Sequence, residues 1–255
     1  MVELVGILNV TPDSFSDGGN FLDPADALAQ AEKLFKDGAS WVDVGAESTR
    51  PGAIPLTPAQ EWQRLEAVLP ALLVRYPGKI SLDTHHPQTA ERALALGDVI
   101  INDVTGMNNP AMVEVVARHK AQCIVSHLPG LDIQLAHQQK QISDVQQVKD
   151  DLLAKLALLG DRGVPLGNII LDPGIGFGKT LQLNLKLLRF AAFVPGHKVM
   201  VGYSRKRFLG EHRMEPGPNL EAARIAIAAG AAYLRVHDVA AHKQLLDELS
   251  HENTR

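Results

Sequence analysis

The stretch GILNVTPDSFSDGG, residues 6–19, carries the first indication of the fold. It opens as a short apolar run that stops at Asn9, where a polar segment rich in turn residues begins. A buried strand that delivers one polar side chain to a glycine-containing loop is typical of an active site at a strand end. A strand followed by an ordinary surface turn has the same pattern, because Thr-Pro-Asp and Asp-Gly-Gly are good turn sequences. Its repetition along the chain favours the first interpretation.

The same transition occurs eight times. Apolar, β-branched runs that end in a polar residue span residues 4–10, 41–47, 79–84, 99–104, 122–127, 168–173, 198–204 and 233–238. Segments with helical spacing of apolar residues begin near Asp23, Pro58, Pro87, Pro110, Asp144, Leu181, Asn219 and Val239. Strands that are apolar almost throughout and alternate with helices imply a parallel sheet covered on its outer face.

Eight such units in 255 residues predict an α/β fold, a (β/α)8 TIM barrel that forms a single domain over residues 1–255. A doubly wound open sheet is the main alternative. That fold usually has fewer strands, and the first strand here is not followed by Gly-x-Gly-x-x-Gly.

The composition limits the possible partners. A net charge of -4 gives no electrostatic reason to expect nucleic acid, and the longest apolar stretch, near residues 225–234, is too short to cross a bilayer. The single cysteine, Cys123, lies in an apolar run and is expected in the core of a protein from a reduced compartment. The first residues show no basic segment before an apolar one, so we expect a cytoplasmic protein without nucleic-acid or membrane partners.

Catalytic groups in such a barrel sit at the carboxyl ends of the strands. The polar residues at the predicted ends are Asn9, Asp43, Glu47, Asp83, Asn102, Asp103, His127, Asp172, Ser204, Arg205, Lys206, Arg235 and His237. Each one alone is more simply a helix cap or a loop anchor. Together they predict a ring of convergent donors and acceptors, which favours a binding site.

Two halves of this ring suit different chemistry. The cationic side follows the seventh and eighth strands, where barrels most often bind phosphate, and it suits an anionic group. The other side, with Asp83, Asn102 and Asp172, suits a flat nitrogen heterocycle whose adjacent N–H groups meet a carboxylate in bidentate fashion. Asn9 beside a phosphate site is a candidate ligand for Mg²⁺, which needs few protein ligands when phosphate supplies the others.

The sequence offers no obvious catalytic nucleophile, because Cys123 lies within a strand and no Gly-x-Ser-x-Gly elbow occurs. His85 and His86 are neighbours on an extended segment, so their side chains are expected to point to opposite sides. Without cysteine partners, a zinc site is not expected there. A heterocycle pocket beside a diphosphate pocket predicts either group transfer with departure of diphosphate or simple binding.

Two long motifs, residues 6–19 and 43–52, resemble the signatures of the dihydropteroate synthase family. Shorter matches follow in the family's order at residues 83–84, 101–103, 172–179, 204–206 and 235–238. The resemblance covers essentially the whole chain. It implies a (β/α)8 transferase of folate biosynthesis that joins 6-hydroxymethyl-7,8-dihydropterin diphosphate to p-aminobenzoate and releases diphosphate.

The resemblance also implies roles for individual residues. The pterin would be held by Asp83, Asn102, Asp172 and Lys206, and the diphosphate by Asn9, Arg235 and His237 together with Mg²⁺. The aminobenzoate pocket, which sulfonamides address as mimics, would be shaped by Phe15, Thr49, Arg50 and Pro51. Phe177 belongs to the implied substrate-binding residues, and Asp83, Asp172, Lys206 and Arg235 to the implied catalytic ones.

The chain departs from the family in several places. His85-His86 stands where many members carry a lysine two positions after the threonine, and Ser126 replaces part of a Met-rich segment. Residues 211–227 are shorter than usual on the face of the family's dimer contact, so a homodimer is one possible state. The alternatives are a pterin-binding paralogue without activity and a pterin-dependent methyltransferase relative. Residues 204–206 and 235–237 argue against the methyltransferase, because methyl transfer needs no diphosphate site.

Overall fold

The protein was analysed as a computed structural model. The structure describes residues 2–10, 24–47, 54–130 and 141–252. The predictions for Phe15, Thr49, Arg50 and Pro51 lie outside these residues.

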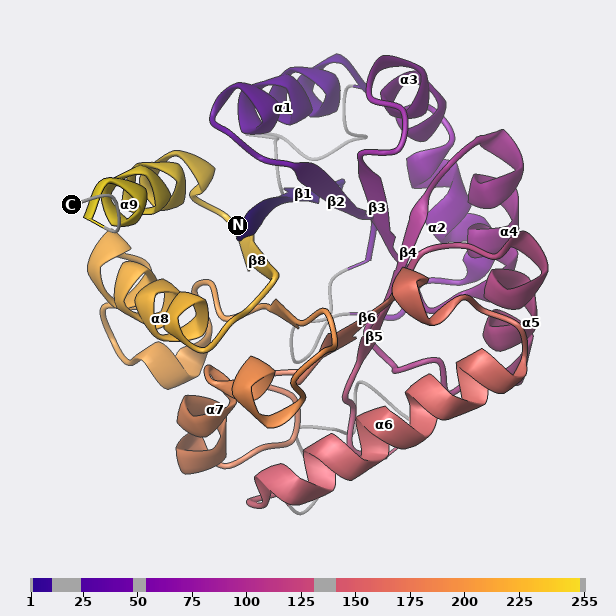
Figure 1. Cartoon of the computed structure of the whole chain (residues 1–255). Coiled ribbons are helices and arrows are strands. Elements are labelled where there is room, and N and C mark those ends of the chain that lie inside the picture. The colour runs from indigo at the N-terminus through magenta and orange to yellow at the C-terminus, as the bar shows by residue number, and fades with distance from the viewer. Residues whose placement is uncertain (1, 11–23, 48–53, 131–140, 253–255) are drawn as a thin grey trace.

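Eight parallel strands form the centre of the molecule (Figure 1). They are β1 (Glu3–Asn9), β2 (Trp41–Gly45), β3 (Ile80–Asp83), β4 (Ile100–Asp103), β5 (Cys123–Ser126), β6 (Ile169–Asp172), β7 (Met200–Val201) and β8 (Tyr233–Val236). Each lies within or overlaps one predicted apolar run, so the prediction of eight strands is confirmed. The runs extend beyond the strands because their last residues already belong to the loops that follow.

The strands close into a barrel. Their order is β6-β5-β4-β3-β2-β1-β8-β7. The gap between β6 and β7 is bridged at Leu171 and Val199, where the Leu171 amide donates to the Lys198 carbonyl at 2.9 Å. The predicted (β/α)8 barrel, a single domain, is therefore confirmed, and an open sheet is excluded.

Helices surround the strands (Figure 1). They are α1 (Pro24–Lys36), α2 (Pro58–Leu65), α3 (Leu69–Arg75), α4 (Pro87–Leu96), α5 (Pro110–His119), α6 (Val145–Asp161), α7 (Leu181–Leu187), α8 (Pro216–Ala228) and α9 (Val239–Glu252). Short 3₁₀ helices span Leu166–Asn168, Phe190–Phe193 and Arg207–Leu209.

Most helices begin where the sequence predicts. α2 begins with a capping box, in which Thr57 and Gln60 satisfy each other's backbone amides. The segment predicted from Pro58 divides into α2 and α3, and Pro70, in the first turn of α3, has no amide to continue an earlier helix. α8 starts at Pro216 rather than near Asn219, because Pro216 stands at its first turn.

The interior of the barrel is filled by side chains at its amino-terminal end. A buried cluster joins one residue from each of six strands: Val5, Ile100, Ile124, Ile170, Met200 and Tyr233. Trp41 packs against this cluster and stacks on Tyr233, with 4.4 Å between ring centroids. Because alternate residues of a strand share a face, these residues define the inward positions of every strand that they belong to.

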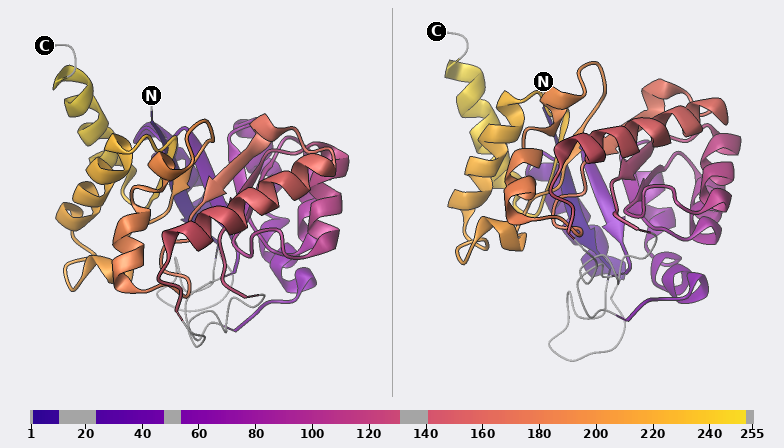
Figure 2. Two further views of the ribbon diagram at one scale, coloured as in Figure 1. Left: turned by 60° about the horizontal axis from the view of Figure 1, so that its bottom comes forward. Right: turned by 90° about the horizontal axis from the view of Figure 1, so that it is seen from below.

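Figure 2 shows that the start of β1 and the end of α9 lie at the same end of the barrel. The strands run from this end toward the opposite one, where their carboxyl ends meet. Within the part of the chain that the structure describes, none of the helices combines the length and the apolar character that spanning a membrane requires.

Candidate active site

A polar layer lies directly above the apolar cluster. Two residues after members of this cluster or after Trp41 stand Asp43, Asn102, Ser126, Asp172, Gly202 and Arg235, while the matching position of β1 is Ile7. Asp83 joins this layer from β3, where it is the register partner of Asn102. Strand register places Gly45 beside Asp83, Asp83 beside Asn102, and Ser126 beside Asp172. The structure thus brings together the predicted pterin residues Asp83, Asn102 and Asp172, at the carboxyl ends of the strands.

Arg235 lies between two carboxylates of this layer. Its Nε donates to Asp43 Oδ2 at 2.6 Å, and one terminal nitrogen donates to Asp83 Oδ2 at 2.9 Å. Burial raises the pKa of Asp83 to about 7, although the Arg235 guanidinium opposes this shift. The structure therefore pairs Arg235 with the carboxylate that was assigned to the pterin, and its predicted contact with diphosphate stays a prediction.

Asp43 was named as a polar strand end but was not assigned to the site. It is fully buried and accepts hydrogen bonds from Ser81 Oγ (2.6 Å) and Asn102 Nδ2 (3.0 Å) besides that from Arg235. Its carboxylate thereby fixes the side chains of two residues that face the pocket. Its inward position in β2, two residues after Trp41, is the signal in the sequence that would have found it.

Asn102 has an acceptor that nothing in the described chain uses. Its amide nitrogen is bound by Asp43, while its Oδ1 is buried and has no hydrogen-bond partner among the described residues. Buried polar atoms are nearly always satisfied. An unsatisfied amide oxygen beside Asp83 therefore marks a place for a ligand with N–H donors.

Asp172 and Lys206 form a second pair of opposite charges at this end of the barrel. The Asp172 carboxylate accepts from the Gly174 amide at 2.7 Å, and burial raises its pKa. Lys206 Nζ donates to the Ile175 carbonyl at 2.6 Å and lies 5.0 Å from the centre of the Phe177 ring. Burial lowers the pKa of Lys206 to about 8, against the attraction of Asp172.

A second buried lysine shapes the loop that carries these contacts. Lys179 Nζ donates to the carbonyl oxygens of Gly174 (2.8 Å), His127 (3.0 Å) and Phe177 (3.1 Å). Gly174 has a φ of 63°, and a Cβ there would lie 2.0 Å from the His127 carbonyl oxygen, so only glycine fits. The sequence analysis included Lys179 in a motif without a role, and the structure makes it the anchor of the loop that contacts Asp172 and Lys206.

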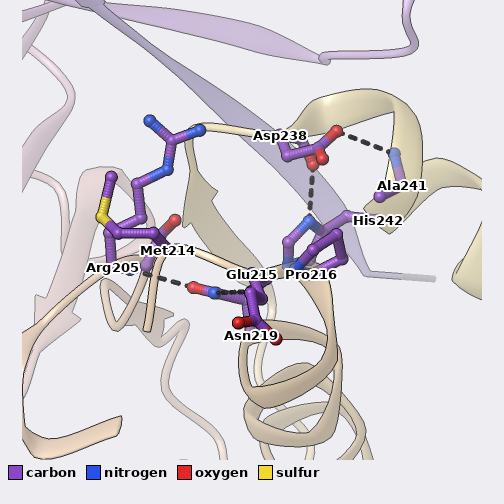
Figure 3. Close-up of a pocket in the computed structure, with 9 residues that line it drawn as sticks. Arg205, Met214, Glu215, Pro216, Asn219, Asp238, Ala241 and His242 are labelled. Carbon is purple, nitrogen blue, oxygen red and sulfur yellow. Dashed lines mark hydrogen bonds between the residues drawn. The ribbon is translucent and has the colours of Figure 1, made fainter. Parts of the chain in front are cut away.

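The loop after β7 is held by Asn219, as Figure 3 shows. Asn219 Oδ1 accepts from the Arg205 amide at 2.9 Å, and its Nδ2 donates to the carbonyls of Arg213 and Glu215. Arg205 adopts a φ of 60° and its side chain is exposed. The neighbouring Ser204 Oγ lies 3.0 Å from His237 Nδ1. This contact orients the side chain of His237, the residue that is predicted to bind diphosphate.

His85 and His86 do not behave as predicted. Their ring centroids lie 4.1 Å apart, so both side chains lie on the same side of the backbone. The expectation that they point in opposite directions was wrong. The His86 amide donates to the Thr84 hydroxyl at 3.1 Å, which turns the chain directly after β3. Both residues lie beside Glu47.

Asn9 is the last residue of β1, and Gly45 is its register partner on β2. Its side chain is half-buried at the carboxyl end of the barrel. Its predicted contact with Mg²⁺ stays a prediction; an amide oxygen is a suitable ligand for this ion, which keeps most of its ligands as water and phosphate oxygens.

Comparison with known proteins assigns this chain to a family. The family described as "Pterin binding enzyme" matches residues 5–237. Dihydropteroate synthase of Neisseria meningitidis serogroup C is 41% identical over 251 residues, which cover 94% of this chain and 88% of the relative.

Solved structures of dihydropteroate synthases are similar to this chain as well. Dihydropteroate synthase of Thermus thermophilus in complex with 4-aminobenzoate superposes with a TM-score of 0.83 at 39% identity, covering 98% of this chain and 93% of that one. The Burkholderia cenocepacia enzyme complexed with 7,8-dihydropteroate gives a TM-score of 0.83 at 31% identity, covering 100% and 92%. The chain belongs to the pterin-binding enzymes and, among them, to the dihydropteroate synthases, which are transferases of folate synthesis.

Proposed function

We propose that this barrel joins 6-hydroxymethyl-7,8-dihydropterin diphosphate to p-aminobenzoate, forming 7,8-dihydropteroate and releasing diphosphate. The single observation that carries the proposal is the inward polar layer, in which the unsatisfied Asn102 oxygen lies beside the Asp83 carboxylate. A pterin ring presents adjacent N–H donors along one edge. These donors match an amide oxygen and carboxylates placed side by side.

In this proposal the pterin lies between two sets of side chains. Asp83 and Asn102 accept from its N–H groups on one side, and Asp172 and Lys206 contact its opposite edge. The Asp172 carboxylate and the Lys206 ammonium supply one acceptor and one donor, held in place by Gly174 and Ile175. The apolar cluster below the layer closes the floor of the pocket and excludes water.

Charge develops in two places when the C–O bond to diphosphate breaks. Positive charge appears on the pterin methylene and ring, and the carboxylates of Asp83 and Asp172 stabilise it. Negative charge appears on the leaving diphosphate, which we assign to Arg235 and His237. Because Asp83 holds Arg235 in the pocket without ligand, engagement of Asp83 by the pterin would release a guanidinium N–H group for the anion.

The second substrate requires little from the protein. The amine of p-aminobenzoate is already nucleophilic, so no strong base is needed to activate it. Phe177, which contacts Lys206, is placed to line the pocket with an apolar surface. Asn9 would hold Mg²⁺, which when bound would neutralise charge on the departing diphosphate.

The test is a turnover assay with pterin diphosphate, p-aminobenzoate and Mg²⁺, in which dihydropteroate and diphosphate are both measured. We expect both products, each dependent on both substrates. Diphosphate without dihydropteroate would place the defect in the aminobenzoate pocket. Tight binding of the pterin without either product would contradict the proposal and identify a paralogue without activity.

A further inference from the structure

A cluster outside the pterin pocket combines one carboxylate and two imidazoles. Glu47 follows β2 by two residues, and His85 and His86 follow β3 directly after Thr84. One ligand atom from each of the three side chains lies within 4.8 Å of the others. The cluster therefore occupies the carboxyl end of the barrel, next to strands that also carry Asp43 and Asp83.

The cluster is half-buried, and two of its atoms form an ion pair with each other but make no hydrogen bond to a described residue. The Glu47 side chain is 9% exposed and that of His86 is 15% exposed. Glu47 Oε2 and His86 Nε2 have no hydrogen-bond partner among the described residues. The nearby Glu61 accepts from the Thr84 hydroxyl through Oε2 at 2.8 Å, while its Oε1 likewise has no hydrogen-bond partner among the described residues. Unsatisfied buried nitrogen and oxygen atoms that face each other call for an additional ligand.

The ion pair between Glu47 and His86 is longer than a charged hydrogen bond and leaves room for a metal ion between the two atoms. Glu47 Oε2 and His86 Nε2 are 3.4 Å apart. Charged N–H···O contacts are shorter, about 2.7–2.9 Å. Two ligands on a tetrahedral Zn²⁺, each about 2.0–2.1 Å from the metal, stand about 3.3 Å from one another. The observed separation matches the second distance.

Two other histidine–glutamate pairs in the chain serve as internal references. His119 Nε2 lies 3.1 Å from Glu91 Oε1, and His212 Nδ1 lies 2.7 Å from Glu215 Oε1. Both pairs are more exposed, and neither belongs to a group of three ligands among the described residues. Histidine and glutamate side chains therefore approach to hydrogen-bonding distance at these two places in the protein. The wider separation of Glu47 and His86 occurs in the three-residue cluster.

We propose that Glu47, His85 and His86 form a binding site for a divalent transition metal, with Zn²⁺ as its best-suited ion. Two imidazole nitrogens and one carboxylate oxygen are the donor set of zinc sites that keep a fourth position open. Mg²⁺ and Ca²⁺ prefer oxygen ligands throughout, so this site differs in chemistry from the one assigned to Asn9.

The experiment is a titration of the metal-free full-length protein with Zn²⁺ by calorimetry, repeated with Co²⁺ as a spectroscopic probe in a large excess of Mg²⁺. We expect one Zn²⁺ per chain and the visible absorption of four-coordinate Co²⁺. Changes to the surroundings of a bound metal already weaken affinity by about 10–100-fold, so loss of a ligand in His85→Ala, His86→Ala or Glu47→Gln should weaken it by about 100-fold or more. His212→Ala is the matched control and should bind Zn²⁺ as the parent does.

Three results would overturn the site: no saturable Zn²⁺ binding by the parent, unchanged affinity in the His85→Ala and His86→Ala proteins, or equal loss in the His212→Ala control. Circular dichroism and thermal unfolding without metal identify any variant that has lost its fold. Should Glu47→Gln be such a variant, His86→Gln tests the same ligand pair. The readout is metal binding, so it does not depend on whether the chain turns over pterin diphosphate.

Discussion

Two layers of side chains inside the barrel come from the same strands and differ in their role. The lower layer consists of apolar residues that pack into a closed floor, including Ile100 and Ile170. The upper layer stands two residues further along these strands and contains Asn102 and Asp172. The upper layer includes Asn102 Oδ1, a buried acceptor that no described residue satisfies.

Residues that stabilise the barrel and residues that are predicted to bind the substrate stand only two positions apart in the same strands. A step of two residues keeps a side chain on the same face of a strand and moves it along the strand by about 7 Å. The lower layer is apolar and buried, with side chains from six strands clustered together. The upper layer is where these strands end, and its carboxylates are therefore held against cations such as Arg235 and Lys206.

The largest effect should come from the upper layer of β6. We expect Asp172→Ala to weaken binding of pterin diphosphate by about 100-fold or more, because removing one partner of a buried charged contact costs about 2–5 kcal/mol. Calorimetric titration measures this directly. The exposed Asp161 provides the control, and Asp161→Ala should bind as the parent does. Equal affinity of the Asp172→Ala protein and the parent would remove that carboxylate from the site.

The residue two positions earlier should show the opposite behaviour. Ile170 is fully buried in the lower layer, and Ile170→Ala should lower the free energy of unfolding by about 2–5 kcal/mol. Denaturant titration measures the loss. Pterin affinity of the protein that remains folded should stay close to that of the parent. A selective loss of affinity with unchanged stability would mean that the two layers are not separate in function.

A smaller effect should follow from a residue that holds two other members of the upper layer. Asp43 holds Arg235 and Asn102, so we expect Asp43→Asn to lower kcat/KM by about 10- to 100-fold, since a hydrogen bond to a charged group contributes about 1.5–3 kcal/mol. Ser81→Ala removes only the donor of one hydrogen bond to Asp43 and should cost about tenfold or less. Steady-state kinetics of both variants tests the ranking, and a larger loss in Ser81→Ala would contradict it.

The pH dependence of pterin binding should be the mildest test. The pterin needs Asp83 ionised and Lys206 charged, and burial moves their pKa values toward each other, to about 7 and about 8. Affinity should therefore fall below pH 7, as Asp83 gains a proton, and above pH 8, as Lys206 loses one, by about tenfold per pH unit. Lys206→Arg should remove the alkaline limb, because arginine does not titrate in this range. An alkaline limb that persists in that variant would assign it to another group.

Much of this site could be predicted from the sequence because strand ends and helix starts are local signals. Asn102 and Asp172 were named because each closes an apolar run. The role of Asp43 could not be predicted in this way, since its partner Arg235 lies 192 positions away and only closure of the barrel joins them. The grouping of Glu47 with His85 and His86 was missed for a similar reason, because the turn at Thr84 overrides strand alternation.

The sequence by itself determined the repeated strand–helix order, the barrel and the residues that stand at the strand ends. These features follow from hydrophobic periodicity and from turn and capping residues, which act over short stretches of chain. Only the tertiary structure decided which of these residues meet: Arg235 between Asp43 and Asp83, Lys179 beneath the loop at Gly174, and Asn219 behind Arg205. Such pairings depend on register and closure, which bring distant segments together and which no local pattern contains.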